Sequence, residues 1–331
     1  MAFGDRLLCL ALQHAAFLRP RERLLLARTL GGADELGRMS PGALEGMLGR
    51  PIRSASCDPR LWLSLARQDM VTLTRGPIGC ILYGEGGYPR QLGEIYDPPL
   101  VLYYRGSLEA IASPGVAVVG TRRPSARARR AARELGEALA LAGVVVISGL
   151  ARGVDAEAHR GALQGGGPHA GVLGNGLESV YPPSSAQLGV RLLSSGGVLL
   201  SEYPPQYQPR KHHFPARNRL ISALARAVIV VQAPEHSGAL ITAEFALEQG
   251  RDVLVHAWGL EGYAGAGGRA LAECGAPVAD SAELLRMLGF PEGAAEAARG
   301  DFEPRGGEGA RGSGLVGARV ASMLQRELGL G

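Results

Sequence analysis

The sequence has few cysteines, almost no lysine and no long apolar run. Its four cysteines, Cys9, Cys57, Cys80 and Cys274, show no CxxC spacing, so neither a disulfide framework nor a zinc ribbon is expected. No uncharged apolar stretch approaches the roughly 18 to 20 residues that a membrane-spanning helix needs. Asp5 precedes the short apolar stretch near the N-terminus and no cleavage site is evident, which disfavours a secretory signal peptide. We therefore expect a cytoplasmic protein that makes no membrane contact.

The basic residues are nearly all arginine. Of 35 lysines and arginines, Lys211 is the single lysine, and together with many alanines and glycines this is typical of a GC-rich genome. The formal net charge is only +4, so the chain as a whole is mildly basic. A length of 331 residues favours two domains over one, because single cores stop growing near roughly 250 to 300 residues. With 46% hydrophobic residues the chain can bury a sizeable core.

The first part of the chain has the pattern of short helices. Leucine-rich amphipathic segments cover residues 6–18, 20–30 and 59–68, and Gly and Pro clusters separate them. We expect a small helical domain over residues 1–80. The segment 81–113 is dense in Gly, Pro and Tyr, and its apolar residues would be costly to leave in water, so we expect a linker packed on the next domain.

From Val116 the pattern changes to short apolar runs that alternate with helical stretches. Continuous β-branched runs of this kind are typical of a parallel sheet covered by helices on both faces. We expect a doubly wound α/β domain over residues 114–289. The runs are VAVV (116–119), VVVI (144–147), AGVL (170–173), GVLL (197–200), AVIVV (227–231) and DVLV (252–255).

The C-terminal segment 290–331 begins with a glycine-rich, charged stretch. Such a composition cannot bury enough apolar surface to offset the entropy of ordering, so a flexible linker is expected. The last 17 residues could form one amphipathic helix. One helix is too little for a complete winged-helix domain.

The loops that leave the predicted strands should carry the functional site, because ligands of open parallel sheets bind at the carboxyl ends of the strands. These loops are rich in glycines, hydroxyls and cations, and several run straight into a helix. Helix N-termini and glycine-rich turns offer unpaired N–H groups to phosphate, so several such loops on one edge suit a polyphosphate backbone. They are GTRRPS (120–125), SGLARGVD (148–155), GNGLESVYPP (174–183), SEYPPQYQPRKHHFPARNR (201–219) and APEHSGA (233–239). The alternative is that their Ser and Asp residues merely cap helices.

The arginines fall into two groups. Arg122 and Arg123 lie in the loop after the first predicted strand, where they can contribute to a binding site. Four arginines of the following helix occupy one arc opposite its alanines and leucines, which indicates a solvated outer face. These four are Arg127, Arg129, Arg130 and Arg133.

No catalytic, cofactor or metal motif is evident. GTRRPS is not GxGxxG and no GxxxxGK[ST] run is present, which disfavours NAD and a Walker-type ATP site. His212 and His213 lack companions at metal-ligand spacing. His159 is more simply a packed or capping histidine than a general base, and His236 beside Ser237 has no third orienting group. We therefore predict no catalytic residue, no cofactor and no metal.

These blocks resemble the DNA-processing protein A family, also called DprA or Smf, whose members mediate natural transformation. The resemblance rests on VAVVGTRRPS, SGLARGVDAEAHRGAL, GVLGNGLESVYPP, HHFPARNRLIS and VIVVQAPEHSGALITAEFALEQG, and it covers roughly residues 84–256. It implies an extended Rossmann-like domain preceded by a helical, SAM-like domain. It also implies a protein that binds single-stranded DNA, forms a homodimer and helps to load the RecA recombinase onto DNA.

The resemblance and the loop analysis together give a predicted DNA-binding set. The resemblance implies Gly120, Thr121, Arg122, Ser148, Gly149, Arg152, Gly153, Asp155, Lys211, Phe214, Arg217, Asn218 and Arg219. The loop analysis adds Arg123, Ser237 and Gly238. Phe214 fits either a ring that stacks on a base or a core residue that anchors its loop.

Two other functions remain open. The LOG-type phosphoribohydrolases, which process nucleotides, share this fold and carry a PGGxGTxxE signature. The corresponding PEHSGALITAEF lacks that signature, since Glu244 follows Thr242 by two positions and not by three. The chain could also serve only as a scaffold for partners, in which case neither DNA nor nucleotide would bind at low salt.

Overall fold

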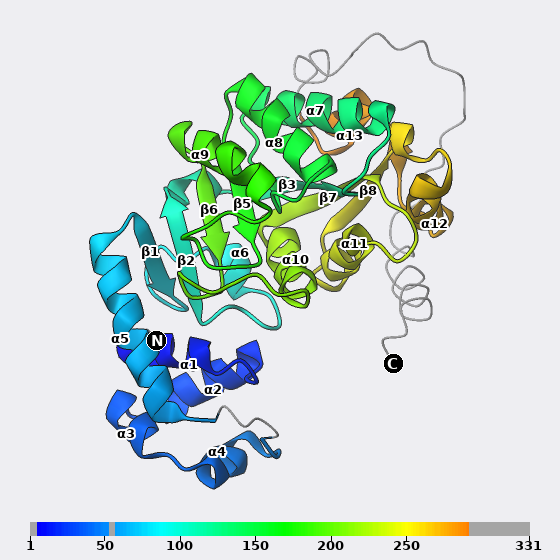
Figure 1. Ribbon diagram of the computed structural model, residues 1–331. Helices are drawn as coiled ribbons and strands as arrows, with labels where there is room; N and C mark the ends of the chain where they lie inside the picture. The colour runs from blue at the N-terminus through cyan, green and yellow to red at the C-terminus, as the bar shows by residue number, and fades with distance from the viewer. Residues whose placement is uncertain (1–4, 53–56, 291–331) are drawn as a thin grey trace.

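The structure, a computed structural model, describes residues 5–52 and 57–290. A group of short helices leads into an α/β domain built on one large sheet (Figure 1). The predicted flexible tail with its C-terminal helix, and the predicted lack of a complete winged-helix domain, lie outside the described residues.

The N-terminal helices begin where side chains cap them. Asp5 accepts a hydrogen bond from the Leu8 amide, and Ser40 accepts one from the Ala43 amide. The predicted helical segments are present, whereas two further helices are too short to show a period in the sequence. The helices are α1 (Arg6–His14), α2 (Pro20–Thr29), α3 (Ala33–Arg38), α4 (Pro41–Leu48) and α5 (Pro59–Arg75).

Within the described residues, nine strands form one sheet in the order β1-β2-β6-β5-β4-β3-β7-β8-β9. All neighbours from β6 to β9 pair in parallel. Each of the six apolar runs that the sequence marks overlaps one of the strands β3 to β8, although the runs 144–147 and 197–200 begin before β4 and β6 do. The mostly parallel, Rossmann-like architecture is therefore confirmed. The strands are β1 (Ile78–Leu82), β2 (Val101–Gly106), β3 (Gly115–Gly120), β4 (Val146–Ser148), β5 (His169–Leu173), β6 (Val198–Ser201), β7 (Ala225–Gln232), β8 (Asp252–His256) and β9 (Val278–Ala279).

The segment that we expected to be a linker is part of this sheet. β1 and β2 pair antiparallel, with Ile81 opposite Leu102, and β2 pairs antiparallel with β6, with Tyr104 opposite Leu200. The expected boundary at residue 80 therefore falls inside β1. The apolar residues that looked too costly to expose are buried as strand residues, and Tyr103 is fully covered.

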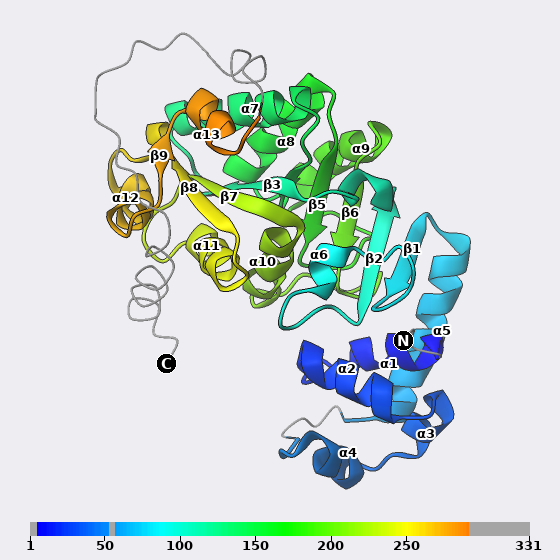
Figure 2. The same ribbon diagram turned by 180° about the vertical axis from the view of Figure 1, so that it is seen from behind.

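Helices cover both faces of the sheet. One face carries α7 to α9 with α13 beside α7, and the other carries α10 and α11 (Figures 1 and 2). These helices are α6 (Arg90–Gly93), α7 (Ala126–Leu141), α8 (Val154–Gly165), α9 (Ala186–Ser194), α10 (His213–Leu224), α11 (Gly238–Glu248), α12 (Ala266–Glu273) and α13 (Ser281–Met287). Single 3₁₀ turns cover Leu108–Ile111, Pro183–Ser185, Ala257–Gly259 and Tyr263–Gly265.

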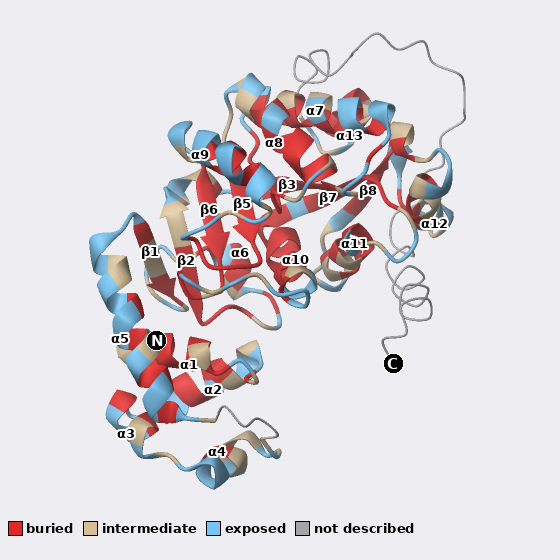
Figure 3. Ribbon diagram, viewed as in Figure 1, coloured by how far each residue is buried: buried red, intermediate tan, exposed pale blue. Residues whose placement is uncertain are grey.

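The core extends without a break from the α/β domain into the helical region. Leu12 and Trp62 of the helices belong to the same buried cluster as Tyr103 of β2 and Leu199 of β6 (Figure 3). The helical region is thus packed on the β1 end of the sheet. None of the helices among the described residues combines the length and the apolar character that crossing a bilayer requires.

The order of the strands reverses at β3, which pairs in parallel with β4 on one side and with β7 on the other. Chain connections diverge at this point, so the loops after β3, β4 and β7 border one crevice at the carboxyl edge. The loops that the sequence singled out therefore meet at the place where open parallel sheets bind ligands.

Candidate nucleic-acid interface

The loop after β3 is held by its neighbours. The Thr121 amide donates to the Gln232 carbonyl at 2.7 Å, and the Ser125 amide donates to Oε1 of Gln232 at 2.8 Å. A Cβ at Gly120 would stand 2.6 Å from Cγ2 of Val154, so the loop approaches α8 more closely than another residue allows. These anchors fix the backbone on both sides of the exposed Arg122 and Arg123.

The loop after β4 packs closely against the loop after β3 and is hydrogen-bonded to it. The Val154 amide donates to the Thr121 carbonyl at 3.2 Å. Gly153 has a φ of +81°, and a Cβ there would stand 2.4 Å from the Thr121 oxygen, so the turn requires glycine. The exposed Arg152 donates from Nε to Oγ of Ser184 at 3.2 Å. Two cation-bearing loops thus form one rigid rim.

Aromatic rings lie beside these cations. The guanidinium of Arg122 lies 5.7 Å from the ring centroid of Phe214, and the Tyr181 ring lies 5.5 Å from that of Phe214. Phe214 is half-buried, and a Cβ at Gly174 would contact its Cδ1 at 3.0 Å, so part of the ring is packed. Phe214 is therefore anchored and still partly accessible, and the exposed Tyr181 extends the same surface.

The N-terminus of α11 opens on the same edge. Ser237 occupies the N-cap position, yet its hydroxyl makes no capping hydrogen bond, and its Oγ finds no partner within the described residues. Gly238 is exposed, and its carbonyl accepts from Nδ2 of Asn218 at 2.9 Å. Oγ of Ser237 is itself buried, so the groups at this helix end that remain for a phosphate oxygen are the backbone amides beside the exposed Gly238.

The sequence matches a known protein family over the whole α/β domain. The family model for DNA recombination-mediator protein A matches residues 79–288, well over half of the sequence. The chain belongs to this family. Protein Smf of Synechocystis is 48% identical over 170 residues, which cover 50% of this chain and 42% of that protein. The chain thus matches only about half the length of such curated relatives.

Solved structures of the family share the fold. DprA of Streptococcus pneumoniae superimposes with a TM-score of 0.67 at 32% identity, covering 84% of this chain and 96% of that one. DprA of Helicobacter pylori gives a TM-score of 0.58 at 28% identity, covering 66% of this chain and 99% of that one. The α/β architecture described above is thus that of the family.

Six residues of the predicted DNA-binding set are buried in this structure, and their part in DNA binding stays a prediction. They are Ser148, Gly149, Asp155, Arg217, Asn218 and Arg219. The Ser148 hydroxyl donates to the Val118 carbonyl at 2.7 Å. Oδ2 of Asp155 accepts from the amides of Gly149 at 3.1 Å and Ala151 at 3.4 Å. These hydrogen bonds hold the loop after β4 in shape and tie it to β3.

Arg217 braces the sheet edge from below. Its Nη1 donates to the carbonyls of Gly149 and Val172, which follow or lie in neighbouring strands. Burial lowers the pKa of this guanidinium to about 10, against the opposing field of Asp155, so it stays protonated at neutral pH. The guanidinium of Arg217 therefore holds backbone carbonyls beneath the loops.

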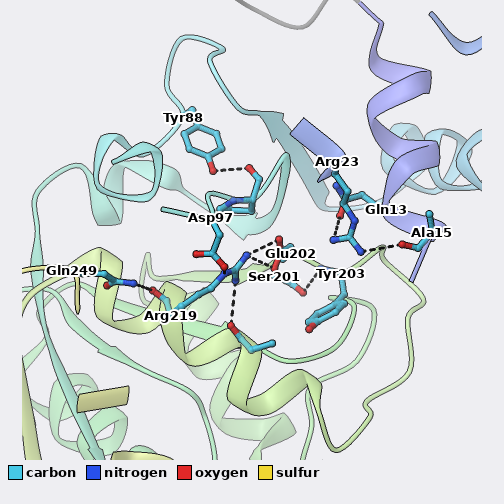
Figure 4. A network of polar contacts seen from close by, with 12 residues as sticks. Gln13, Ala15, Arg23, Tyr88, Asp97, Ser201, Glu202, Tyr203, Arg219 and Gln249 are labelled. Atoms are coloured by element: carbon cyan, nitrogen blue, oxygen red, sulfur yellow. Dashed lines mark hydrogen bonds and ion pairs between the residues drawn. The ribbon is translucent and has the colours of Figure 1, made fainter. Parts of the chain in front are cut away.

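Arg219 lies at the centre of a buried ion-pair network (Figure 4). Its Nη2 donates to both carboxylate oxygens of Glu202 at 2.8 Å, and its Nε donates to Oδ2 of Asp97 at 2.8 Å. The Arg219 side chain is only 4% exposed. A direct contact between Arg219 and DNA is therefore not available in this structure, and its role is to join α10 to the loops carrying Asp97 and Glu202.

The remaining ten residues of the set lie at or near the surface. Arg122, Arg123, Arg152, Lys211 and Gly238 are exposed, and Gly120, Thr121, Gly153, Phe214 and Ser237 are half-buried. The sequence analysis missed Tyr181 and Gln232. Tyr181 lies in the loop 174–183, which the sequence had marked as part of the site, and an aromatic residue in that loop could have been recognised as a possible stacking partner for a base. Gln232 acts through hydrogen bonds across 107 positions, for which the sequence holds no signal.

The arginines of α7 form an outer face, as predicted. Arg127 pairs with Glu261 at 2.6 Å, Arg130 with Glu134 at 2.5 Å, and Arg133 with Glu157 at 2.5 Å. In these pairs the arginines are exposed while Glu157 is buried, and together the carboxylates neutralise much of the positive charge of the helix, so α7 contributes little to a basic surface.

Of the histidines singled out in the sequence, His159 and His213 are buried and His212 and His236 are exposed. His159 is fully buried, and desolvation lowers its pKa to about 3, so it is a neutral packed residue as predicted. His212 and His213 meet at a ring-centroid distance of 4.5 Å. Among the described residues, no group of three or more His, Cys, Asp or Glu side chains could hold a metal ion.

Gly149→Ala should lower the free energy of unfolding by about 1 to 2 kcal/mol. A Cβ at this position would stand 2.6 Å from Nη2 of Arg217, and the buried guanidinium has little room to retreat. Urea denaturation of the variant and the wild type would measure the difference. Gly42→Ala is the control, because a Cβ at Gly42 meets open space and the substitution should change stability little. A glycine with positive φ, such as Gly143, is unsuitable as a control because alanine would be strained there. Equal stability of Gly149→Ala and wild type would contradict the bracing role.

Proposed function

We propose that this chain binds single-stranded DNA at the carboxyl edge of its sheet. The observation that carries the proposal is the cluster in which the exposed Arg122 lies 5.7 Å from the Phe214 ring while Tyr181 flanks that ring. Bases of a single strand stack on aromatic rings, and cations beside the rings neutralise the backbone. A duplex hides its base faces, so this arrangement favours an unpaired strand.

The phosphate contacts would come from the rim of this cluster. Arg122, Arg123, Arg152 and Lys211 are exposed, and the sequence from residue 203 to 234 contains five cations and no acid. At the start of α11 the exposed Gly238 lets a phosphate approach the backbone amides of the helix N-terminus. Phosphate contacts carry no sequence information, so binding should be largely independent of base sequence.

Relatives support this proposal. DprA of Helicobacter pylori binds single-stranded DNA, in a mode described as unique for that protein. The family is described as recombination mediators. We further propose, from the family resemblance, that this chain acts as a cytoplasmic homodimer and helps to load RecA onto DNA during natural transformation. In this proposal it binds DNA without catalysing a reaction on it.

The affinity for single-stranded DNA should fall steeply with salt. Each phosphate that a cation neutralises releases counterions, which gives a slope of about −0.7 per contact in log affinity against log salt. Four exposed cations at the rim would therefore give a slope of about −3. Fluorescence anisotropy with labelled single-stranded and duplex oligonucleotides across a salt series measures it. Salt-independent binding, or equal affinity for the duplex, would overturn the proposed interface.

The enzyme hypothesis has its own test. Thr242 donates its hydroxyl to the Gly238 carbonyl within α11, and Glu244 is buried on the same helix. Incubation with nucleoside monophosphates should release no free base, because the loop lacks the signature of the nucleotide-processing enzymes. Release of free base would replace the proposal of a non-catalytic binder.

A further inference from the structure

A cavity of about 310 Å³ lies between the N-terminal helices and the loop that follows β6. One wall belongs to α1 and α5, and the other belongs to the segment 204–210. That segment continues directly into Lys211 and Phe214 of the proposed DNA-binding surface. The sequence analysis assigned no function to this place.

Stacked rings fix the cavity wall to the proposed DNA surface. The His213 ring stacks on Tyr203 at 4.1 Å, and Tyr207 lies 5.5 Å from His213. Nδ1 of His213 lies 3.1 Å from the Gly174 carbonyl. Burial, together with the nearby His212, lowers the pKa of His213 to about 4, so above that pH the neutral ring donates this hydrogen bond. Tyr207 of the cavity is thereby held next to the residue that precedes Phe214.

The cavity has a positive charge at its rim and a negative charge in its wall, an arrangement that suits the phosphate and the base of a nucleotide. At its rim the exposed Arg210 holds its guanidinium 5.5 Å from the Tyr207 ring centroid. In its wall Asp69 is only 6% exposed and accepts from Nε2 of His14 through Oδ2 at 2.7 Å. A buried carboxylate repels phosphate, whereas the cation at the rim attracts it. The base of a nucleotide would therefore point inward and its phosphate outward.

The donors and acceptors of the wall suit one kind of base edge. Within the described residues Asp69 makes no hydrogen bond through Oδ1, so that atom keeps lone pairs for a donor. Gln68 of α5 and Gln208 of the loop line the same cavity. Carboxylates accept hydrogen bonds from the exocyclic amino group of cytosine, but thymine carries a carbonyl at that position.

We propose that this cavity binds one base of the DNA strand whose neighbouring bases lie on Phe214, and that it prefers a base with an exocyclic amino group. The inference rests on the proposed function, because the strand must first be held at Arg122 and Phe214. It goes beyond that function by giving the helical region a direct contact with DNA and by adding base selectivity to a backbone-driven interface.

Binding of oligo-dC and oligo-dT of about twelve nucleotides tests the preference, because this length spans a typical single-strand site. Both are pyrimidines, so the comparison isolates the amino group from ring size. The wild type should bind oligo-dC about tenfold more tightly, the effect of one hydrogen bond to a charged group. Asp69→Asn offers an amide that can also donate to the thymine carbonyl, so the ratio should fall to about one.

A second variant guards against a folding defect. Gln68→Ala alters an exposed residue of the same wall, so it should leave the thermal melting temperature unchanged and still reduce the dC preference. Gln164→Ala is a matched control, because Gln164 is an exposed glutamine of α8, remote from the cavity wall. An unchanged dC to dT ratio in both Asp69→Asn and Gln68→Ala would overturn the proposal.

Photo-cross-linking separates this proposal from the underlying function. Oligonucleotides carrying 5-iododeoxycytidine should cross-link to peptides that contain Tyr207 or residues 65–72, as identified by mass spectrometry. Cross-links confined to the Phe214 or Tyr181 peptides would overturn the cavity proposal and leave DNA binding at the sheet edge intact. If wild-type protein binds neither oligonucleotide at low salt, the proposed function itself fails.

Discussion

Arg122→Ala and Lys211→Ala should each weaken binding of single-stranded DNA by about tenfold, and the double variant by about a hundredfold. Both side chains are exposed, and neither forms an ion pair within the described residues. Their charges are therefore available to phosphate, and a charge-assisted hydrogen bond to phosphate is worth about 1.5 kcal/mol or more. Arg122 also loses its contact with the Phe214 ring.

Arg129→Ala provides the matched control for this experiment. Arg129 is an exposed arginine of α7, on the outer face and not in a loop of the carboxyl edge. Its loss should change the affinity less than twofold, since isolated surface charges act only through the screened field. Anisotropy titrations with several sequences would also show whether the two variants weaken all of them alike. Unchanged affinity in both Arg122→Ala and Lys211→Ala would remove the proposed interface.

The sequence predicts the parallel part of the sheet well because burial on both faces leaves a simple pattern. The run AVIVV, for example, lies within β7, whose last six residues are all buried. β1 and β2 lack this pattern, since Gly79 and Arg105 interrupt them and Gly106 ends β2 with positive φ. Among the described strands β1 pairs only with β2, and β2 in turn pairs with β6, almost a hundred positions away in the chain, and no local period reveals such pairing.

The site is predicted at the level of loops but not of side-chain direction. Topology alone brings the carboxyl ends of parallel strands together, so the gathering of the loops follows from the strand pattern. Whether the arginines of α10 point into the protein or toward solvent depends on partners that are distant in sequence. Arg219 meets Glu202 and Asp97, the latter 122 positions away. Helical spacing held one clue, because Arg217 lies four residues before the buried Ile221 and thus shares its inward face.

Lys211 differs from the arginines of α7 in its surroundings. Three exposed arginines of α7 form ion pairs with Glu261, Glu134 and Glu157, as expected for a solvated face. The single lysine is exposed in a segment without acids, between Arg210 at the cavity and Phe214 at the loop cluster. Its role in DNA binding stays a prediction, and it is the position where the two proposed base sites would share a phosphate.

Glu202→Gln should lower the free energy of unfolding by about 3 to 5 kcal/mol. The substitution keeps the shape of the side chain but removes the charge that both oxygens present to Nη2 of Arg219. Arg219 then remains buried with Asp97 as its one remaining carboxylate partner, so its desolvation is only partly offset. Urea denaturation measures the loss. Glu94→Gln removes an exposed pair with Arg90 and should cost less than about 1 kcal/mol.

The same variant decides between a bracing and a DNA-contacting role for Arg219. If Arg219 is a brace, Glu202→Gln measured well below its unfolding transition should bind single-stranded DNA about as tightly as wild type. If Arg219 leaves Glu202 to contact phosphate, removal of the competing carboxylate should tighten binding, because the cation would no longer have to break a buried pair. A small stability loss combined with tighter binding would therefore restore Arg219 to the DNA-binding surface.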